Sequence, residues 1–343
     1  MGFDGRVSPA PVVLAHRGVP GERLEHTRPS YLLAIEQGAD YIEPDIVSTK
    51  DGVLVVRHEN EISGTTDVAD RSEFADRLAT KVVDGKEHTG WFTEDFTLDE
   101  LKTLRTKERI PDLRPGNVPL DGVEPILTFD EVLDIALQGT ATRDNPVGVY
   151  VETKHPSYFE SVGISLNDLL IDALERRDLN TPDAKITIQS FESGNLQAIR
   201  SRTPAVVVQL MSPSGAPADF VVAGDERTYA DLREPEGLEF VASYADAIGP
   251  YKDLVIARDS EGNLAEPTGL VDAAHAAGLD VHIWTMRHEN AFLPANLRSG
   301  TDKAAHGDAV GEYLAFFDAG VDGLFSDFTQ TAVQARSQWL ARQ

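Results

Sequence analysis

The chain has 343 residues and no cysteine, and its 57 acidic against 31 basic side chains give a net charge of -26. The lack of cysteine excludes disulfides, thiol catalysis and cysteine–metal clusters, and the acidic surplus argues against non-specific binding to nucleic acid or anionic lipid. A hydrophobic content of 41%, with no apolar run near the ~18 residues of a membrane span, predicts a soluble globular protein.

The first ten residues contain neither the basic nor the apolar segment of a secretion signal. We therefore expect no such signal in the chain as given. A mature exported protein with an added Met-Gly start would look the same, and the missing cysteines do not decide the compartment.

Short apolar, β-branched runs alternate with helical patterns along most of the chain. The runs are typical of parallel strands covered on both faces, and they lie at Val12–Ala15, Tyr41–Val47, Val147–Glu152, Lys185–Gln189, Ala205–Leu210, Ser243–Ile248, Asp280–Thr285 and Val321–Phe325. The helical patterns lie at Pro29–Gln37, Phe129–Leu137, Leu166–Arg177, Gly194–Arg200, Gly269–Ala277 and Val310–Ala319. This alternation predicts an α/β fold of the TIM type, a (β/α)8 barrel.

One interval is much longer than a single strand–helix unit, with roughly a hundred residues between Val47 and Val147. Its first part predicts a hairpin with Asp51-Gly52 as the turn, which would place His58 opposite Asp45. The remainder, residues 59–122, is predicted to be a small insertion subdomain after the second strand, packed over the barrel mouth. The whole chain, residues 1–343, is expected to form one barrel domain.

Two carboxylates share one face of the second predicted strand. Glu43 and Asp45 are two positions apart, and Ile42 and Ile46 point to the other face. Two inward carboxylates would repel each other unless a cation joined them, so a divalent metal ion is the natural partner. A solvated acidic patch remains the alternative.

The segment His16-Arg17-Gly18 follows the first predicted strand directly and so should lie at the barrel mouth. Arg17 offers a planar fork for phosphate oxygens, and Gly18 lets the backbone turn close to a ligand. His16 and His58 are candidate proton carriers. Structural histidines at a loop start and at a hairpin end remain the alternatives.

Three later strand ends add candidates. Glu152 could supply a third metal oxygen, and Lys154, two residues on, a second cation for phosphate. Gln189 could donate to a substrate oxygen and Trp284 could form an apolar wall. A surface ion pair and core packing are the alternatives, and no serine-hydrolase elbow, Walker loop, dinucleotide fingerprint or zincin motif is present.

The chain resembles the glycerophosphodiester phosphodiesterases, most closely the exported bacterial type. The resemblance runs through residues 15–18, 25–27, 38–45, 49–52, 58, 65–71, 152–154, 244–250 and 323–327, so it covers nearly the whole chain. It implies a TIM-type barrel with a small insertion, a divalent cation held by Glu43, Asp45 and Glu152, and acid–base catalysis by His16 and His58. One departure is Glu59, where an aspartate often follows the histidine.

The resemblance implies cleavage of glycerophosphodiesters such as glycerophosphocholine to sn-glycerol 3-phosphate and an alcohol. Ca²⁺ is expected ahead of Mg²⁺, and the partners expected are a small-molecule substrate and, at most, a second copy of the chain, because the protein is predicted to be a monomer or homodimer. An extracytoplasmic location is expected, with a cytoplasmic one as the alternative.

Three other functions remain open at this point. The enzyme could release glycerol phosphate from a teichoic-acid-like polymer, or it could be a phospholipase of the sphingomyelinase D type, against which the insertion and residues 16–18 argue. The chain could also be a non-catalytic surface protein that only binds glycerophosphodiesters. The presence of both histidines and of three candidate metal ligands argues against this last reading.

Overall fold

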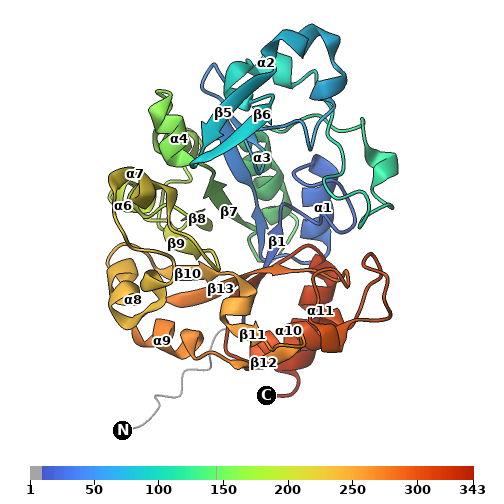
Figure 1. Ribbon diagram of the computed structural model, residues 1–343, viewed down its shortest axis with the longest axis vertical. Helices are drawn as coiled ribbons and strands as arrows, with labels where there is room; N and C mark the ends of the chain where they lie inside the picture. The colour runs from blue at the N-terminus through green and yellow to red at the C-terminus, as the bar shows by residue number, and fades with distance from the viewer. Residues whose placement is uncertain (1–9, 144) are drawn as a thin grey trace.

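The computed structural model describes residues 10–143 and 145–343, and its centre is a closed barrel of parallel strands (Figure 1). The barrel closes because β1 pairs with both β2 and β14, while β2 and β3 both pair with β7. In chain order its strands are β1 (Val12–His16), β2 (Tyr41–Glu43), β3 (Asp45–Ser48), β7 (Gly148–Thr153), β8 (Ile186–Ser190), β9 (Val206–Met211), β10 (Ala247–Pro250), β13 (Asp280–Met286) and β14 (Gly323–Ser326). The predicted TIM-type barrel is confirmed.

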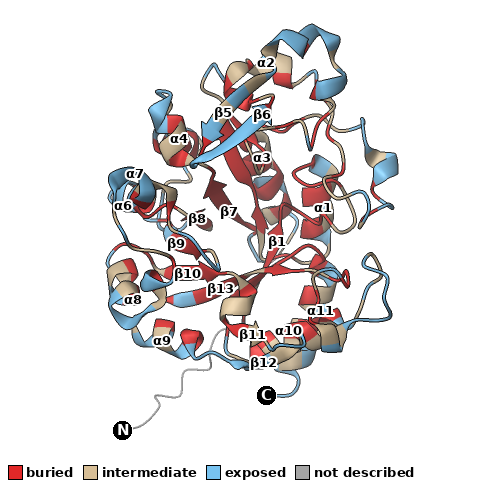
Figure 2. Ribbon diagram, viewed as in Figure 1, coloured by how far each residue is buried: buried red, intermediate tan, exposed pale blue. Residues whose placement is uncertain are grey.

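Helices cover the outside of the barrel, and the largest apolar cluster lies between them and the strands. They are α1 (Arg28–Glu36), α3 (Phe129–Thr140), α5 (Leu166–Glu175), α6 (Ser193–Arg200), α8 (Pro235–Ala242), α9 (Leu270–Ala276), α10 (Ala309–Asp318) and α11 (Thr329–Leu340). Figure 2 shows the barrel strands almost wholly buried and the outer faces of the helices exposed. None of the helices among the described residues combines the length and the apolarity that crossing a membrane requires.

The predicted elements on the later part of the chain differ from the observed ones in the following respects. Neither α8 nor α11 was predicted. The sequence of α11 is rich in threonine, glutamine and serine and shows little apolar periodicity. The predicted strand Ser243–Ile248 begins too early, since the chain leaves α8 at Ser243 and turns before β10 starts at Ala247.

A small apolar layer fills the barrel interior and places the polar groups above it. Leu14, Tyr150 and Phe325 belong to this layer. Residues two positions further along a strand point to the same side, so the next inward positions on β1 and β7 are His16 and Glu152. The layer therefore forms the floor on which a polar site is built at the carboxyl ends of the strands.

The second barrel strand is interrupted at Pro44. The sequence predicted one strand over Tyr41–Val47, whereas the structure has β2 and β3 on either side of the proline. Proline has no backbone N–H for the ladder, but its carbonyl still accepts a hydrogen bond from Glu152 N at 2.9 Å. Both halves pair with β7 and remain part of the barrel wall.

The predicted hairpin forms, but its register is shifted by one residue. β3 pairs antiparallel with β4 (Leu54–Val56), and Ile46 lies opposite Val56. The turn is a three-residue loop over 50–52, closed by a hydrogen bond from the amide of residue 49 to the carbonyl of residue 53 at 3.0 Å. Gly52 takes the left-handed conformation, with φ +76°, that such a loop requires.

The shifted register corrects one prediction about the site. Arg57, and not His58, lies opposite Asp45, and its amide donates to the Asp45 carbonyl at 3.1 Å. The predicted Asp45–His58 pairing was therefore wrong. His58 still reaches the barrel mouth because it is the next residue after this contact, and its Nε2 lies 3.2 Å from Lys154 Nζ.

The segment over 59–122 lies between β4 and α3, at the top of the view in Figure 1. Its elements are η1 (Val68–Asp70), η2 (Ser72–Arg77), β5 (Ala79–Val83), β6 (Lys86–Gly90), η3 (Thr93–Asp95), α2 (Leu98–Leu101) and η4 (Val118–Leu120). β5 and β6 form a hairpin of their own, and most of β6 is exposed (Figure 2). That this segment forms a subdomain of its own stays a prediction.

The remaining elements belong to loops around the barrel mouth and the outer wall. They are α4 (Pro156–Ser161), α7 (Ala218–Ala223), η5 (Asp231–Arg233), η6 (Lys252–Leu254), β11 (Ile256–Arg258), β12 (Leu264–Pro267) and η7 (Ala295–Leu297). β11 and β12 pair as a short antiparallel ribbon. The loops that follow β9 and β13 contain only the short helical segments α7, η5 and η7.

Candidate active site

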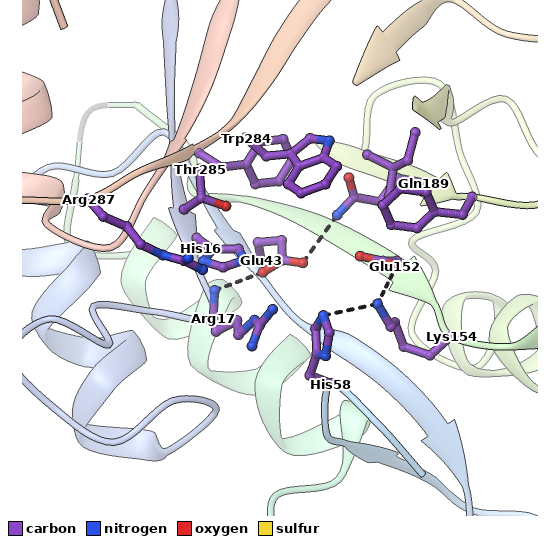
Figure 3. A pocket seen from close by; sticks show the side chains of 13 residues that line it. His16, Arg17, Glu43, His58, Glu152, Lys154, Gln189, Trp284, Thr285 and Arg287 are labelled. Carbon is purple, nitrogen blue, oxygen red and sulfur yellow. Dashed lines mark hydrogen bonds and ion pairs between the residues drawn. The ribbon is translucent and has the colours of Figure 1, made fainter. Parts of the chain in front are cut away.

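The carboxyl ends of the barrel strands surround a cavity of about 230 Å³ (Figure 3). Eight of the nine predicted site residues line it, and the ninth, Asp45, lies directly behind them. The lining residues are His16, Arg17, Glu43, His58, Glu152, Lys154, Gln189, Phe191, Leu210, Trp284, Thr285, Arg287 and Phe325. The structure thus brings all predicted site residues together, while their individual roles stay predictions.

Three buried carboxylates form the acidic side of the cavity. Glu43, Asp45 and Glu152 come from β2, β3 and β7, and one oxygen of each lies within 4.8 Å of the others. Burial raises the pKa of Glu43 well above its usual range, and its two acidic neighbours raise it further. Burial likewise raises the pKa of Glu152 to about 8. Such a cluster is stabilised by a bound cation.

The cluster also offers a polar atom that the described residues leave unpaired. Asp45 Oδ1 is buried without a hydrogen-bond partner in the described parts of the chain, while Asp45 Oδ2 accepts from His26 Nε2 at 2.9 Å. Lys154 Nζ lies 2.7 Å from Glu152 Oε1 and 4.0 Å from Asp45 Oδ1, so it compensates only part of the negative charge. Three converging carboxylates, one of which has a buried oxygen without a hydrogen bond from the described residues, fit a hard divalent cation.

His16 faces the cavity with one ring nitrogen fixed from behind. Its Nδ1 lies 2.6 Å from the carboxylate of Asp327, which directly follows β14. This hydrogen bond favours the tautomer with the proton on Nδ1 and leaves Nε2 to accept a proton from a ligand. Burial, and then the nearby charge of Arg17, lowers the pKa of His16 to about 4, so the ring is neutral near pH 7.

His58 is fixed in the same way on the opposite side. Its Nδ1 bonds the carboxylate of Glu59, and its Nε2 faces Lys154 at 3.2 Å. Burial is the main cause that lowers the pKa of His58 to about 3, and the charges of Arg17 and Lys154 contribute. Two neutral histidines thus present Nε2 toward the same cavity (Figure 3).

Arg17 and Arg287 bring guanidinium groups to the cavity rim. Arg17 has a left-handed backbone, φ +56°, and its amide donates to Glu43 at 2.7 Å, which turns the chain sharply at the end of β1. Arg287 directly follows β13, and its Nε donates to Asp327 at 2.9 Å. With Lys154 these two arginines bring three cationic groups to the cavity, a set whose charge suits an anionic ligand.

An aromatic wall closes the side opposite the carboxylates. Trp284 lies on β13 with its Nε1 donating to the Gly249 carbonyl at 2.7 Å. Phe191 and Tyr251 pack edge-on against it, with ring centroids 5.6 and 5.0 Å away. Gln189 points into the cavity between this wall and the carboxylates and donates to Glu43 at 3.1 Å.

Some functional candidates were not assigned a role from the sequence. Arg287, Thr285, Glu59 and Asp327 were left without one, although Arg287 and Asp327 each follow directly on a barrel strand. The rule that placed His16 at the barrel mouth, a polar residue at the carboxyl end of a strand, would also have selected these two. The family resemblance singled out Glu59 as a departure but gave it no role, and its contact with Arg109 depends on the fold of the insertion.

Comparison with known proteins identifies the family. The model of the glycerophosphoryl diester phosphodiesterase family matches residues 16–331. Glycerophosphodiester phosphodiesterase GDPD6 of Arabidopsis thaliana is 38% identical over 335 residues, which cover 93% of this chain and 84% of the plant protein. The glycerophosphodiester phosphodiesterase of Haemophilus influenzae is 27% identical and covers 94% of this chain and 89% of its own length.

Solved structures share the fold. A glycerophosphoryl diester phosphodiesterase structure from Silicibacter pomeroyi has a TM-score of 0.66 at 20% identity and covers 96% of this chain and 94% of that one. An Oleispira antarctica phosphodiesterase, in complex with its product sn-glycerol-3-phosphate, has a TM-score of 0.60 at 20% identity, with coverage of 96% and 97%. The plant relative is more similar, at 38% identity, than the bacterial one, at 27%, so the exported bacterial type stays a prediction.

Proposed function

The chain belongs to the glycerophosphoryl diester phosphodiesterase family, and we propose that it hydrolyses small glycerophosphodiesters, such as glycerophosphocholine, with the help of a divalent cation. The products would be sn-glycerol 3-phosphate and the free alcohol. One observation supports this proposal above all: two histidines and two buried carboxylates line one cavity at the carboxyl ends of the barrel strands, with the third carboxylate, that of Asp45, directly behind them.

Glu43, Asp45 and Glu152 would hold the cation, because they are the three buried carboxylates whose oxygens converge. The chemistry that a divalent cation supplies at such a site is neutralisation of charge on the phosphate oxygens. Three carboxylate oxygens suit a hard divalent cation, and we propose Ca²⁺ ahead of Mg²⁺. The wider requirement is any hard divalent cation.

The protein's own residues provide the other elements of the reaction. Arg17, Arg287 and Lys154 bind the phosphate and orient the phosphodiester. Trp284 and Phe191 offer an apolar surface to the carbon skeleton of the glycerol or the head group. Binding of an anion also adds negative charge beside the histidines, which makes it easier for one of them to carry a proton.

The two histidines divide the proton transfers. Nε2 of one takes the proton of the glycerol 2-hydroxyl, whose oxygen attacks phosphorus, while Nε2 of the other donates a proton to the departing alcohol oxygen. The bond from phosphorus to the alcohol oxygen breaks and a cyclic phosphate forms. Water then opens this ring with the proton roles reversed. A substrate without the 2-hydroxyl should be cleaved poorly, and efficient turnover of a 2-deoxy analogue would contradict internal attack.

Assays on glycerophosphocholine in the presence of EDTA, Ca²⁺ or Mg²⁺ test the proposal. We expect no turnover with EDTA and recovery on addition of Ca²⁺, with less recovery on Mg²⁺. Absence of turnover under every condition would favour a protein that only binds glycerophosphodiesters. Release of glycerol phosphate from a polymer in preference to glycerophosphocholine would favour the teichoic-acid-like substrate.

We also propose an extracytoplasmic location, on the strength of the resemblance to the exported bacterial type. Fractionation of the source cells, with detection of the protein in the extracytoplasmic or culture fraction, tests it. Recovery from the cytoplasmic fraction alone would contradict it.

A further inference from the structure

Both histidine–carboxylate pairs contact an arginine from the same stretch of the insertion. Glu59, the partner of His58, receives Arg109 Nη1 at 2.7 Å. Asp327, the partner of His16, receives Arg114 Nη2. The two arginines are five residues apart in a segment that contains no regular helix or strand. Two proton carriers on opposite sides of the cavity are thus connected to one short loop.

Each arginine is held by a second carboxylate as well. Arg109 Nε and Nη2 donate to Glu25 at 2.9 and 2.7 Å, and Arg114 Nε donates to Glu289 at 2.6 Å. A guanidinium bound on two edges has little freedom to rotate. Arg114 is 6% exposed and Arg109 27% exposed at the side chain. Both are therefore fixed points behind the histidines.

The loop that contains these two arginines is also anchored to the barrel mouth, through Asn117. The side-chain amide of Asn117, which is buried, donates to the Pro20 carbonyl at 2.9 Å and to Glu108 at 2.8 Å. Pro20 lies in the loop that follows β1 and His16. The insertion loop is thus tied to the segment that leads away from the first histidine.

Neither arginine lines the cavity, so neither is placed to touch the substrate. We propose that Arg109 and Arg114 are positioning residues: each fixes the carboxylate that orients one catalytic histidine. Residues 108–117 would then support the active site from behind the two histidine–carboxylate pairs. The inference depends on the proposed function, because it assigns these arginines to the same two histidines.

A purely structural role is the competing explanation, since a buried ion pair can support a fold without affecting chemistry. The two explanations differ in kinetics. Misplaced histidines slow the chemical step while substrate still binds to Arg17, Arg287 and Lys154, so kcat falls and KM changes little. General loosening of the insertion lowers stability and has no selective effect on kcat.

The test compares Arg109→Gln and Arg114→Gln with Arg77→Gln in the full chain. Arg77 lies in the same insertion, pairs with Glu100 and stacks on Phe96, and touches neither histidine pair. We expect each of the first two variants to lose about 10- to 100-fold in kcat with KM changed less than about threefold. Arg77→Gln should keep its kcat and lose only thermal stability.

A double-mutant cycle locates the effect, because Arg109 also contacts Glu25, which in turn contacts Arg17 at 3.2 Å. If Arg109 acts through Glu59, adding Arg109→Gln to a Glu59→Gln background causes little further loss of kcat. Likewise, if Arg114 acts through Asp327, adding Arg114→Gln to an Asp327→Asn background causes little further loss of kcat. An undiminished loss in these backgrounds would overturn the proposal, and so would an equal loss of kcat in Arg77→Gln.

The lysine variants replace the glutamine variants if these do not fold. Lysine keeps the charge but lacks the planar guanidinium whose two edges hold the two carboxylates in fixed positions, so the same selective fall in kcat is expected. Failure of the wild-type protein to hydrolyse any glycerophosphodiester would contradict the proposed function. An active wild type whose arginine variants keep full kcat would contradict only the positioning role.

Discussion

The two sides of the active site are built by different parts of the molecule. His16 ends β1, and Asp327 follows β14, the strand that pairs with β1, so the register of neighbouring barrel strands fixes this pair. His58 follows β4, which lies outside the closed barrel, and its partner Glu59 is the next residue. The side chain of Asp327 is 2% exposed and that of Glu59 36%. The barrel strands therefore bring His16 and Asp327 together, with Arg114 of the insertion behind Asp327, whereas the position of His58 and Glu59 depends on a hairpin and the insertion.

Removal of either histidine should have the largest effect and would show whether the two sides are equally necessary. His16→Ala and His58→Ala should each lower kcat by about 10² to 10⁴, because each removes one proton-transfer group. Steady-state hydrolysis of glycerophosphocholine measures this loss. Near-normal turnover in one variant would mean that only one side of the site performs acid–base chemistry.

A third histidine provides the matched control. His275 on α9 pairs with Asp322 at 2.7 Å, its side chain is 39% exposed, and it does not line the cavity. His275→Ala should therefore keep normal kcat. A comparable loss in this variant would mean that the assay reports general instability of the fold.

Replacement of the two partner carboxylates by amides should show how differently the two sides of the site depend on them. Asp327→Asn should lower kcat by about 100-fold and Glu59→Gln by about 10-fold, since Asp327 is buried and Glu59 can be replaced in part by water. Both substitutions keep size and shape, so the measurement is kcat with circular dichroism as the check on folding. A larger loss in Glu59→Gln would reverse the ranking of the two sides.

The contrast also explains what could be predicted from the sequence. The apolar runs of a parallel barrel are continuous, so the strands and the polar residues at their ends, such as His16, Glu152 and Gln189, could be found. The hairpin register was wrong by one residue because alternation does not distinguish a two-residue from a three-residue loop. The contacts of Arg109 and Arg114 could not be predicted, since an irregular loop has no period that determines its position.

The pH dependence of stability should separate the two histidines. Burial lowers the pKa of His16 to about 4, from 6.5 in an unfolded chain. Between these values the unfolded chain binds a proton that the folded site does not, so stability is full above pH 6.5 and is lost as pH falls toward 4. At pH 4.5 the free energy of unfolding should therefore be lower than at pH 7 by roughly 2–3 kcal/mol because of His16.

Urea unfolding at pH 7 and pH 4.5 measures the loss of unfolding free energy on acidification. This loss should be smaller in His16→Gln than in the wild type, and the difference is the effect of His16. We expect a smaller difference for His58→Gln. Its pKa is lowered further, to about 3, but its side chain is 27% exposed against 11% for His16, so a protonated ring can turn toward water. Equal differences for the two variants would show that both rings are equally confined.

The smallest expected effect concerns the turn that positions His58. Gly52 and Gly85 are the turn glycines of the β3–β4 and β5–β6 hairpins, and both have φ +76°. An added Cβ would meet only Leu169 at 3.9 Å at the first and nothing within 4 Å at the second. Alanine at either position therefore introduces the same backbone strain without a clash, and each variant should lose about 1 kcal/mol of stability.

The activities of the two variants should nevertheless differ. β4 leads directly to His58, whereas β5 and β6 contribute no side chain to the cavity. Strain in the first turn can shift His58 against Lys154, so Gly52→Ala should lower kcat a few-fold, while Gly85→Ala should leave it unchanged. Parallel measurement of unfolding and of kcat separates the two effects. If both variants lost activity in proportion to stability, the position of His58 would depend on the whole insertion rather than on its own hairpin.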